Sequence, residues 1–320
     1  MSPVLSVRDL RVGFATDDGQ VRAVDGVSFD VDAGEVLAIV GESGCGKSVT
    51  AQTLIGLTRS PNTTITGSVL FDGRDLTMLP DKELQKLRGA RIAMVFQDPM
   101  TSLNPVYRVG DQIAEAIRAH RDVPKARALE HAVELLEMVG IPNPQRRVRD
   151  YPHEFSGGMR QRVMIAMALS CDPEVIIADE PTTALDVTIQ AQILDLLRNL
   201  NRENNVAVVL ITHDLGVVAE LAHRVVVMYA GQVVEQASLE ELFAAPGHPY
   251  TRGLLNSIPR MDGPRSARLP QIPGHPPSLL TPPDGCRFAA RCPDAFADCA
   301  QEPPLVNHAD HQVRCWNAVR

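Results

Sequence analysis

Val36–Ser48, read as VLAIVGESGCGKS, is the stretch that decides the fold of this 320-residue chain. The apolar run at its start has the length and the β-branched content of a strand that is buried on both faces. The rest fits the phosphate-loop pattern G-x-x-x-x-G-K-[ST] at every fixed position, and a helix is expected from Val49 to Leu57. The residues of the loop are Gly41, Glu42, Ser43, Gly44, Cys45, Gly46, Lys47 and Ser48. Because a strand precedes the loop and a helix follows it, the sequence predicts nucleotide binding.

The groups of this loop suit a polyphosphate together with its magnesium ion. Glycines let successive backbone N–H groups turn toward phosphates with no Cβ in the way. Lys47 can reach the β- and γ-phosphates, and the Ser48 hydroxyl can ligate Mg²⁺. The helix that begins near Val49 points the positive end of its dipole at the same anion. We therefore expect a nucleotide and Mg²⁺ at this site.

The overall composition narrows the class of protein. Hydrophobic residues make up 44% of the chain, enough for a sizeable core, and the formal net charge is −8. Proteins that coat nucleic acid usually present a basic face, so this charge argues against that class. No apolar run approaches the ~20 residues that cross a bilayer, and the N-terminal MSPVLSVRDLRVGF lacks a signal-peptide pattern. We expect a cytoplasmic protein whose contacts with any membrane go through a partner.

Two kinds of periodicity divide the chain. Apolar and polar residues alternate from Leu5 to Phe14 and from Gly26 to Val31, which predicts antiparallel strands. From Val109 onward, apolar residues recur at three- and four-residue spacing, which is typical of helices. We expect an α/β fold that combines a core sheet around the phosphate loop, an antiparallel β subdomain, and an α-helical subdomain over about residues 100–170.

The composition changes toward the C-terminus. After about Leu242 the chain becomes rich in proline, and four of its six cysteines lie near the end, at Cys286, Cys292, Cys299 and Cys315. In a reducing cytosol such a group is more often a metal site than a pair of disulfides. We place the domain boundary in this region, with a nucleotide-binding domain over residues 1–255 and a small Cys-rich extension over residues 256–320.

Three further apolar strands end in residues that can take part in phosphate chemistry. The residues that follow these strands are Gln97, Asp179 with Glu180, and His213. At a strand end beside a phosphate loop, Asp179 is placed to hold Mg²⁺ or its water, and Glu180 can orient the attacking water. His213 is a candidate because ligands of α/β sheets collect at the ends of core strands.

Two other features carry less information by themselves. Ser156 is a natural N-cap, and Gly157 and Gly158 at the start of the same helix make a second potential anion site. Phe14 lies upstream of the phosphate loop on a segment of small and polar residues. It either stacks on an adenine ring or fills space beside an edge strand, and the local sequence leaves both open.

Taken in order, these residues resemble the ATP-binding subunits of ABC transporters over about residues 5–255. The members of the set are the phosphate loop, Gln97, the segment Ser156–Gly158, Asp179 with Glu180, Asp186 and His213. The signature segment reads FSGGMRQR rather than the commonest LSGGQ, so Phe155 replaces Leu and Met159 replaces Gln. The residues that would face phosphate are intact, and we expect the segment to be competent.

The resemblance implies a role for each matched residue. Phe14 would stack on adenine, and Gln97 would contact Mg²⁺ and the attacking water. Glu180 would be the general base or would position that water, and His213 would contact the γ-phosphate. Lys47 and the rest of its loop would hold the phosphates of ATP.

The resemblance also implies a head-to-tail dimer. ATP would lie between the phosphate loop of one subunit and the segment Ser156–Gly158 of the other, with Asp186 crossing the interface. An isolated subunit should then hydrolyse ATP slowly, because phosphoryl transfer depends on positioning and charge stabilisation. We expect the segment Gln97–Pro105 to receive a coupling helix of a separate permease subunit.

The C-terminal part narrows the resemblance to a subfamily. HPYTRGLL at His248–Leu255, IPG at Ile272–Gly274 and GCRFAARC at Gly285–Cys292 look like the ATP-binding subunits of dipeptide and oligopeptide importers. This subfamily implies a related but distinct second ATPase, and hence a heterodimer. It also implies two permease subunits, an extracytoplasmic peptide-binding protein, and a peripheral location at the cytoplasmic face of the inner membrane.

The four cysteines of the extension have the spacing C-x5-C-x6-C-x15-C. Structural zinc sites favour paired C-x2–4-C ligands, whereas iron–sulfur clusters accept varied spacing. Some members of the importer subfamily carry a [4Fe–4S] cluster on such cysteines, so the resemblance implies one here. Zinc, disulfides and free thiols stay open as alternatives, and His308 and His311 are nearby substitute ligands.

Other functions are compatible with a phosphate loop alone. A soluble ABC ATPase of DNA repair or translation would carry two cassettes or a long coiled-coil insertion, and this sequence has neither. A P-loop kinase or GTPase would have no use for Ser156–Gly158 and His213 at these places. The solute is not encoded in an ATPase subunit, so nickel or haem are alternatives to a peptide. The resemblance implies an ATPase that energises peptide import.

Overall fold

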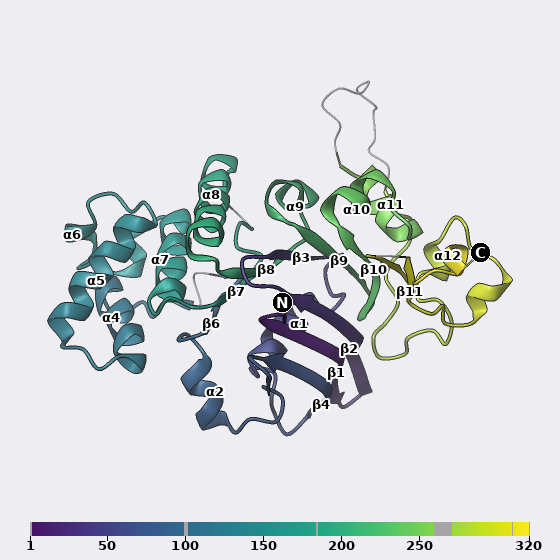
Figure 1. Cartoon of the computed structure of the whole chain (residues 1–320), viewed down its shortest axis with the longest axis horizontal. Coiled ribbons are helices and arrows are strands. Elements are labelled where there is room, and N and C mark those ends of the chain that lie inside the picture. The colour runs from purple at the N-terminus through teal and green to yellow at the C-terminus, as the bar shows by residue number, and fades with distance from the viewer. Residues whose placement is uncertain (1, 99–101, 184, 259–270, 309, 320) are drawn as a thin grey trace. The chain divides into compact units, whose positions relative to one another are not determined.

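A computed structural model describes residues 2–98, 102–183, 185–258, 271–308 and 310–319 (Figure 1). The chain divides into two compact units, and each is described by itself. The first comprises residues 1–4, 32–35 and 78–211, and the second comprises residues 5–31, 36–77 and 212–320. The domain boundary expected at residue 255 stays a prediction; the residues on both sides of it lie in the second unit.

Parallel strands form the buried centre of the first unit. They are β6 (Ile92–Val95), β7 (Val175–Asp179) and β8 (Ala207–Thr212), in the order β6-β7-β8. Every residue of β7 and β8 is buried. Near-continuous apolar sequences such as VIIAD and AVVLIT are typical of parallel strands that are covered on both faces. Because these strands are parallel, the residues after β6 and after β7 emerge at the same edge of the sheet.

The rest of the first unit is mainly helical. Its helical elements are α2 (Asp81–Leu87), α4 (Val109–His120), α5 (Lys125–Met138), α6 (Pro144–Arg147), the 3-10 turn η1 (Pro152–Glu154), α7 (Gly157–Leu169) and α8 (Val187–Asn204). Helices α4, α5 and α7 pack on one another, and Figure 1 shows them grouped with α6. Ile113 and Ile117 of α4, and Ala132 and Leu136 of α5, are buried at four-residue spacing. This confirms the helical subdomain predicted from periodicity.

The second unit contains an antiparallel sheet and a group of strands around the phosphate loop. The antiparallel sheet has the order β2-β1-β4-β5, and its strands are β1 (Leu5–Thr16), β2 (Gly19–Val31), β4 (Thr63–Phe71) and β5 (Arg74–Asp75). The other strands are β3 (Val36–Val40), β9 (Arg224–Tyr229), β10 (Gln232–Ser238), β11 (Val306–His308) and β12 (His311–Val313). Strand β9 is parallel to β3 and antiparallel to β10, which in turn pairs with β12. The antiparallel β subdomain is therefore confirmed, and the C-terminal extension adds strands to the second group.

Short helices complete the second unit. They are α1 (Lys47–Leu54), α9 (Leu215–Leu221), α10 (Leu239–Ala244), α11 (Pro249–Asn256), α12 (Trp316–Val319) and the 3-10 turns η2 (Ala289–Arg291) and η3 (Ala297–Ala300). One apolar cluster joins β3, β9, α9 and α11, and Phe288 of the extension lies in it beside Tyr229 and Tyr250. The ring centroid of Phe288 lies 5.2 Å from that of Tyr229 and 5.4 Å from that of Tyr250. The extension thus shares a core with the strand that leads into the phosphate loop.

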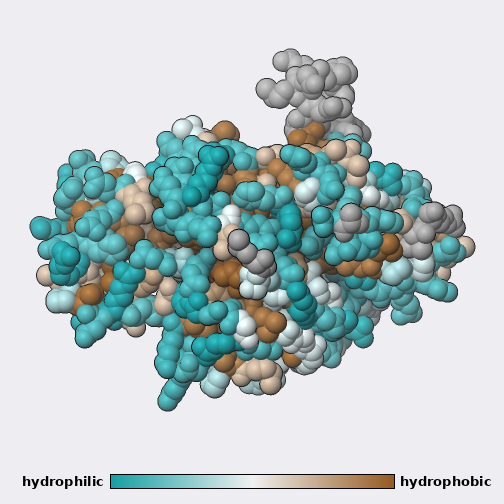
Figure 2. Space-filling model, viewed as in Figure 1, coloured by the Kyte–Doolittle hydropathy of each residue, from teal (hydrophilic) through white to brown (hydrophobic). Residues whose placement is uncertain are grey.

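The surface of the molecule is mixed. Figure 2 shows a face on which hydrophilic residues predominate and apolar residues form scattered groups. Among the residues that the structure describes, no helix is both long and apolar enough to span a lipid bilayer.

Candidate nucleotide-binding and catalytic site

The phosphate loop lies between two elements that the fold holds in place. Strand β3 is buried at every residue, and α1 starts where the loop ends. Gly41 and Gly46 have φ angles of 153° and 101°, a region that glycine adopts without steric cost. A Cβ at Gly41 would lie 2.2 Å from the carbonyl oxygen of Met228, and a Cβ at Gly46 would lie 2.3 Å from that of Ala23. The glycines of the motif therefore let the loop pack tightly against neighbouring backbone.

Lys47 folds back over the loop that precedes it. The residue is 5% exposed, and its Nζ donates hydrogen bonds to the carbonyl oxygens of Gly41 at 2.7 Å and Glu42 at 2.9 Å. These partners are neutral, so the bonds hold the ammonium group in place without cancelling its charge. Burial raises the pKa of the neighbouring Cys45 thiol, which keeps that side chain neutral. The loop therefore presents a cation and backbone N–H groups, which is the chemistry that binds a polyphosphate.

The first unit brings together two of the predicted catalytic residues. Gln97 follows β6, Glu180 follows β7, and Nε2 of Gln97 donates a hydrogen bond to Oε2 of Glu180 at 2.9 Å. The hydroxyl of Thr183 donates to the same oxygen at 2.8 Å. Glu180 has a φ of 48°, a strained conformation that is uncommon for a residue with a side chain and often occurs at functional sites. Two neutral donors therefore fix the orientation of this carboxylate.

Asp179 is the last residue of β7 and is 3% exposed. Its carboxylate belongs to the oxygen ligands that Mg²⁺ prefers, as does the hydroxyl of Ser48 at the start of α1. Magnesium ions in nucleotide sites need only one or two carboxylates, since phosphates and waters supply the other ligands. The donor groups present in this chain therefore fit a nucleotide-bound Mg²⁺.

The second predicted anion site is the N-terminus of α7. The side chain of Ser156 accepts a hydrogen bond from the backbone N–H of Met159 at 3.3 Å, so it is the N-cap of this helix. Ser156 and Gly157 are exposed. A Cβ at Gly157 would meet no atom within 4 Å, whereas one at Gly158 would lie 2.8 Å from Cγ2 of Ile189. Gly158 is therefore required by packing against Ile189 within the chain, whereas Gly157 borders an open surface.

The sequence comparisons extend over the whole chain. The ABC transporter model matches residues 24–183, and the model "Oligopeptide/dipeptide transporter, C-terminal region" matches residues 234–299. The chain is 54% identical to the dipeptide transport ATP-binding protein DppD of Bacillus subtilis over 99% of its own length and 95% of that protein. It is 53% identical to the oligopeptide transport ATP-binding protein OppD of Escherichia coli, over 99% and 94% of the two chains.

The chain belongs to the ABC transporter family. Its fold also resembles that of a solved structure of the ATP-binding cassette MJ0796, a dimer in a post-hydrolysis state with ADP and Pi. The TM-score is 0.67 at 30% identity, and the match covers 73% of this chain and 98% of that one. The fold and the family expected from the ordered motifs are therefore confirmed.

The remaining predicted site residues of this ABC ATP-binding chain occupy separate places. Asp186 is the N-cap of α8 and accepts a hydrogen bond from the N–H of Ile189 at 3.0 Å. His213 follows β8 and is exposed. Phe14 lies in β1 opposite Val21 and is half-buried. Val49 is half-buried in α1. The segment expected to receive a coupling helix falls partly on residues 99–101, which lie outside the described residues.

The C-terminal extension of this ABC subunit supplies contacts that the sequence motifs did not reveal. Arg291 forms an ion pair with Glu42 of the phosphate loop, with a 2.6 Å hydrogen bond from NH1. Just before the extension, the hydroxyl of Tyr250 in α11 accepts a hydrogen bond from the N–H of Glu42 at 2.8 Å. Arg287 pairs with Asp25 of β2. Both arginines belong to the GCRFAARC segment, in which the cysteines were given a predicted role and the arginines were not.

The iron–sulfur prediction finds no support in this extension. All six cysteines of the chain are free thiols and lie in the described part. Within the described ranges, no group of three or more His, Cys, Asp and Glu side chains is arranged to hold a metal ion. Cys286 and Cys292 pack against the apolar cluster, and burial raises the pKa of the Cys292 thiol to about 11. The arrangement of these thiols in the described residues therefore does not match that of a metal or cluster site.

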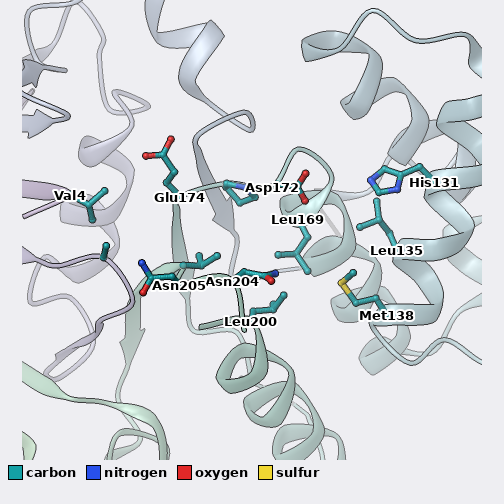
Figure 3. Close-up of a pocket in the computed structure, with 13 residues that line it drawn as sticks. Val4, His131, Leu135, Met138, Leu169, Asp172, Glu174, Leu200, Asn204 and Asn205 are labelled. Carbon is teal, nitrogen blue, oxygen red and sulfur yellow. The ribbon is translucent and has the colours of Figure 1, made fainter. Parts of the chain in front are cut away.

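A cavity of about 560 Å³ lies in the first unit (Figure 3). Leu135 and Met138 of α5, Leu169 of α7 and Leu200 of α8 form much of its apolar wall. Glu174, just before the start of β7, also lines it. None of the predicted nucleotide-site residues lines this cavity, which lies at the amino end of β7, whereas Asp179 lies at the carboxyl end.

Proposed function

We propose that this chain is the ATP-hydrolysing subunit that energises the import of dipeptides or oligopeptides through a membrane permease pair. The observation that carries this proposal is the match to dipeptide and oligopeptide transport ATP-binding proteins along nearly the whole chain, including the C-terminal region. A cassette matched in the ATP-binding core alone would leave the solute class open. The C-terminal match is what favours a peptide.

The residues of the site divide into those that bind and those that act on water. Lys47 and the N–H groups of the loop bind the phosphates of ATP, while Ser48 and Asp179 hold Mg²⁺. The bound ion neutralises charge on the phosphates. Glu180 orients or deprotonates the attacking water, because hydrogen bonds from Gln97 and Thr183 hold its carboxylate in place.

His213 and Phe14 complete the proposed site. His213 contacts the γ-phosphate, a role supported by its exposed position after a core strand. Phe14 stacks on the adenine ring, a role supported by its half-buried side chain in β1. Hydrogen bonds and stacking of this kind orient the nucleotide rather than change its chemistry.

The active form in this proposal is a dimer of ATP-binding subunits. Ser156, Gly157 and Gly158 contact the nucleotide held by the partner, and Asp186 lies at the same interface. The open surface at Gly157 supports this role, because the helix N-terminus is accessible there. The similar cassette MJ0796 is described as a dimer with ADP and Pi bound. The partner is a second, related ATPase, which makes the pair a heterodimer.

The complete system also contains two permease subunits and an extracytoplasmic peptide-binding protein. The chain attaches to the cytoplasmic face of the inner membrane through the permeases. A [4Fe–4S] cluster on Cys286, Cys292, Cys299 and Cys315 is a separate hypothesis. Iron and sulfide analysis after anaerobic purification tests it: four of each per chain would establish the cluster, and a metal-free preparation would exclude it.

Reconstitution tests the proposed function directly. The chain is co-expressed with the permeases and the ATPase of its gene neighbourhood, purified through a tag on this chain, and placed in liposomes. We expect ATP-dependent uptake of a labelled dipeptide or oligopeptide when the peptide-binding protein is present. Recovery of the chain with ribosomes or DNA, and without membrane proteins, would contradict the proposal.

A further inference from the structure

The extension reaches the phosphate loop through one buried arginine. The side chain of Arg291 is 5% exposed. Its NH1 and NH2 donate to the two carboxylate oxygens of Glu42, at 2.6 Å and 2.9 Å. Its Nε donates to the carbonyl oxygen of Pro273 at 2.8 Å, and NH1 also contacts the hydroxyl of Tyr229 at 3.2 Å. This is the two-pronged geometry that makes an arginine–carboxylate pair both strong and directional.

Aromatic rings hold the guanidinium group in this position. It lies 5.7 Å from the centroid of Tyr229 and 5.9 Å from that of Phe288. Phe288 is part of the apolar cluster, and Arg291 ends the 3-10 turn that follows it. The hydrogen bonding of Arg291 to the Glu42 carboxylate is the main reason that the pKa of Arg291 is raised. The charge of this arginine is therefore permanent, and its place is set by the core.

Glu42 is contacted at every polar group it has. Its carboxylate receives Arg291, its N–H donates to Tyr250, and its carbonyl oxygen accepts from Lys47. Glu42 occupies a variable position of the phosphate-loop pattern, so the motif itself does not require a carboxylate there. A residue that is linked to two parts of the C-terminal region and to the phosphate-binding lysine can transmit the state of the extension to the loop.

The charge of Glu42 gives this contact a consequence for nucleotide binding. An unpaired carboxylate in a loop that wraps a polyphosphate repels the phosphates, and the repulsion grows with the charge of the nucleotide. Arg291 cancels that charge inside a partly buried environment, where electrostatic interactions are less screened than in bulk water. The side chain of Glu42 is 28% exposed, so solvent screens only part of the effect.

We propose that Arg291 is a positioning residue for the nucleotide. It acts through Glu42, holding the phosphate loop in shape and neutralising a carboxylate that would otherwise disfavour ATP over ADP. The C-terminal extension of the chain thereby sets the nucleotide preference of the ATP site. This inference rests on the proposed function, because it requires the loop to bind ATP.

The test measures dissociation constants of the full-length chain for MgATP and MgADP with a fluorescent nucleotide, at low salt. For Arg291→Met we expect affinity for MgATP to fall by roughly ten- to thirtyfold, the order that Coulomb's law predicts for one uncancelled charge near a second. MgADP should lose less, so the ratio of ATP to ADP affinity falls. For Glu42→Gln, which leaves a cation beside the loop, the ratio should rise.

Further variants separate electrostatics from packing. In Arg291→Met/Glu42→Gln the ratio should return to within about threefold of the wild-type value, because neither charge remains. Arg291→Lys keeps the charge but loses the two-pronged geometry, and should keep the ratio while weakening both nucleotides. The matched control is Arg252→Met. Arg252 pairs with Asp294 on the surface of the same region, with a side chain that is 45% exposed, and its loss should change neither constant.

The outcomes distinguish this proposal from the proposed function. A wild-type chain that binds neither nucleotide would refute the function itself. A wild-type chain that binds MgATP, with an unchanged ratio in a folded Arg291→Met variant, would overturn only the role of Arg291. If Arg291→Met does not fold, Glu42→Gln alone tests the proposal. A ratio of ATP to ADP affinity that stays at the wild-type value, or falls below it, in Glu42→Gln would overturn the proposal. A purely structural role predicts that both single variants weaken the two nucleotides alike.

Discussion

Two helix N-termini in this chain are predicted to face phosphate, and they are built in opposite ways. The start of α1 is enclosed: Lys47 is 5% exposed, and a Cβ at Gly46 would lie 2.3 Å from a carbonyl oxygen. The start of α7 is open: Ser156 and Gly157 are exposed, and a Cβ at Gly157 would meet no atom within 4 Å. An enclosed end binds with groups of its own chain, whereas an open end offers the same chemistry to whatever docks there. Substitutions at the enclosed end should therefore impair nucleotide binding by the isolated chain. Substitutions at the open end should impair hydrolysis in the assembled complex and leave binding by the isolated chain intact.

The largest expected effect follows from separating binding from water activation. For Glu180→Gln in the assembled complex, ATP turnover should fall by about 10²- to 10³-fold, because the amide keeps the shape of the side chain but cannot accept a proton. Affinity for MgATP should stay within about threefold. Steady-state phosphate release and equilibrium nucleotide binding measure the two quantities.

A matched control lies just before the start of the same strand. Glu174 precedes β7 and pairs with Arg91 on the surface, where its side chain is 47% exposed. Glu174→Gln should leave turnover unchanged. Normal turnover in Glu180→Gln would show that the enclosed end of α1 suffices for hydrolysis, and the assignment of Glu180 would be wrong.

The two glycines test the comparison itself. Gly46→Ala should weaken MgATP binding by at least about thirtyfold, because the added methyl group must displace backbone and the φ of 101° is strained for alanine. Gly157→Ala should leave binding by the isolated chain unchanged, since the methyl group enters open space. In the assembled complex, however, Gly157→Ala should reduce turnover. Equal losses of binding in the two isolated variants would remove the distinction between enclosed and open ends.

The stability of the fold around the enclosed end should depend on pH because of His248. Its Nδ1 accepts a hydrogen bond from the N–H of Tyr250 at 3.0 Å, and burial lowers its pKa to about 3. Below the unfolded pKa of about 6.5, the unfolded chain binds a proton that the folded chain does not. Stability is therefore lost as the pH falls from about 6.5 toward 3, by up to about 1.4 kcal/mol per pH unit.

The variant His248→Asn isolates this titration, because an amide oxygen can accept the same N–H but does not titrate. Urea unfolding at pH 7, 6 and 5 measures the free energy of unfolding of both proteins. The difference between wild type and variant should shift in favour of the variant as the pH falls. A difference that is constant with pH would show that His248 takes up its proton in the folded chain.

The smallest effect is expected beside the open end. Phe155 precedes the N-cap of α7, is 3% exposed, and has the guanidinium of Arg147 at 5.6 Å from its ring centroid. Phe155→Leu should lower the free energy of unfolding by about 1 kcal/mol, the cost of a nearly volume-conserving change. Turnover should stay within about twofold, since Ser156 and the glycines are untouched. A tenfold loss would mean that this position acts on the nucleotide and not only on packing.

Local patterns predicted the strands of the sheet well where they were apolar. The apolar runs Val175–Glu180, which ends in two acids, and Val206–Thr212 predict buried strands, and β7 and β8 occupy the same residues to within one. The β1–β2 hairpin was predicted too short. Strand β2 begins at Gly19, where it pairs with Thr16, and not at Gly26. Its first residues are exposed. They therefore show no alternation of buried apolar and exposed polar residues, and only their pairing with β1 makes them part of a strand.

In the C-terminal extension, by contrast, the residues that stand out in the sequence are not the ones that make the contacts with the phosphate loop. Its cysteines stood out in the sequence and suggested a metal site, whereas the described thiols have no such arrangement. Its arginines did not stand out, because arginine on a polar, proline-rich segment usually lies in solvent. Arg291 is nevertheless buried and holds the phosphate loop. Burial of a charged residue depends on a partner, and a one-dimensional pattern does not name the partner.

By itself, the sequence determined that the chain binds a nucleotide and that it belongs with the ABC transporter ATPases. Both conclusions rest on short motifs whose backbone geometry is set by neighbouring residues. Only the tertiary structure decided that Glu42 pairs with Arg291, 249 residues away, and that one of the two helix ends predicted to face phosphate is enclosed while the other is open. Contacts between residues so far apart depend on how strands and helices pack, and local periodicity carries no information about that.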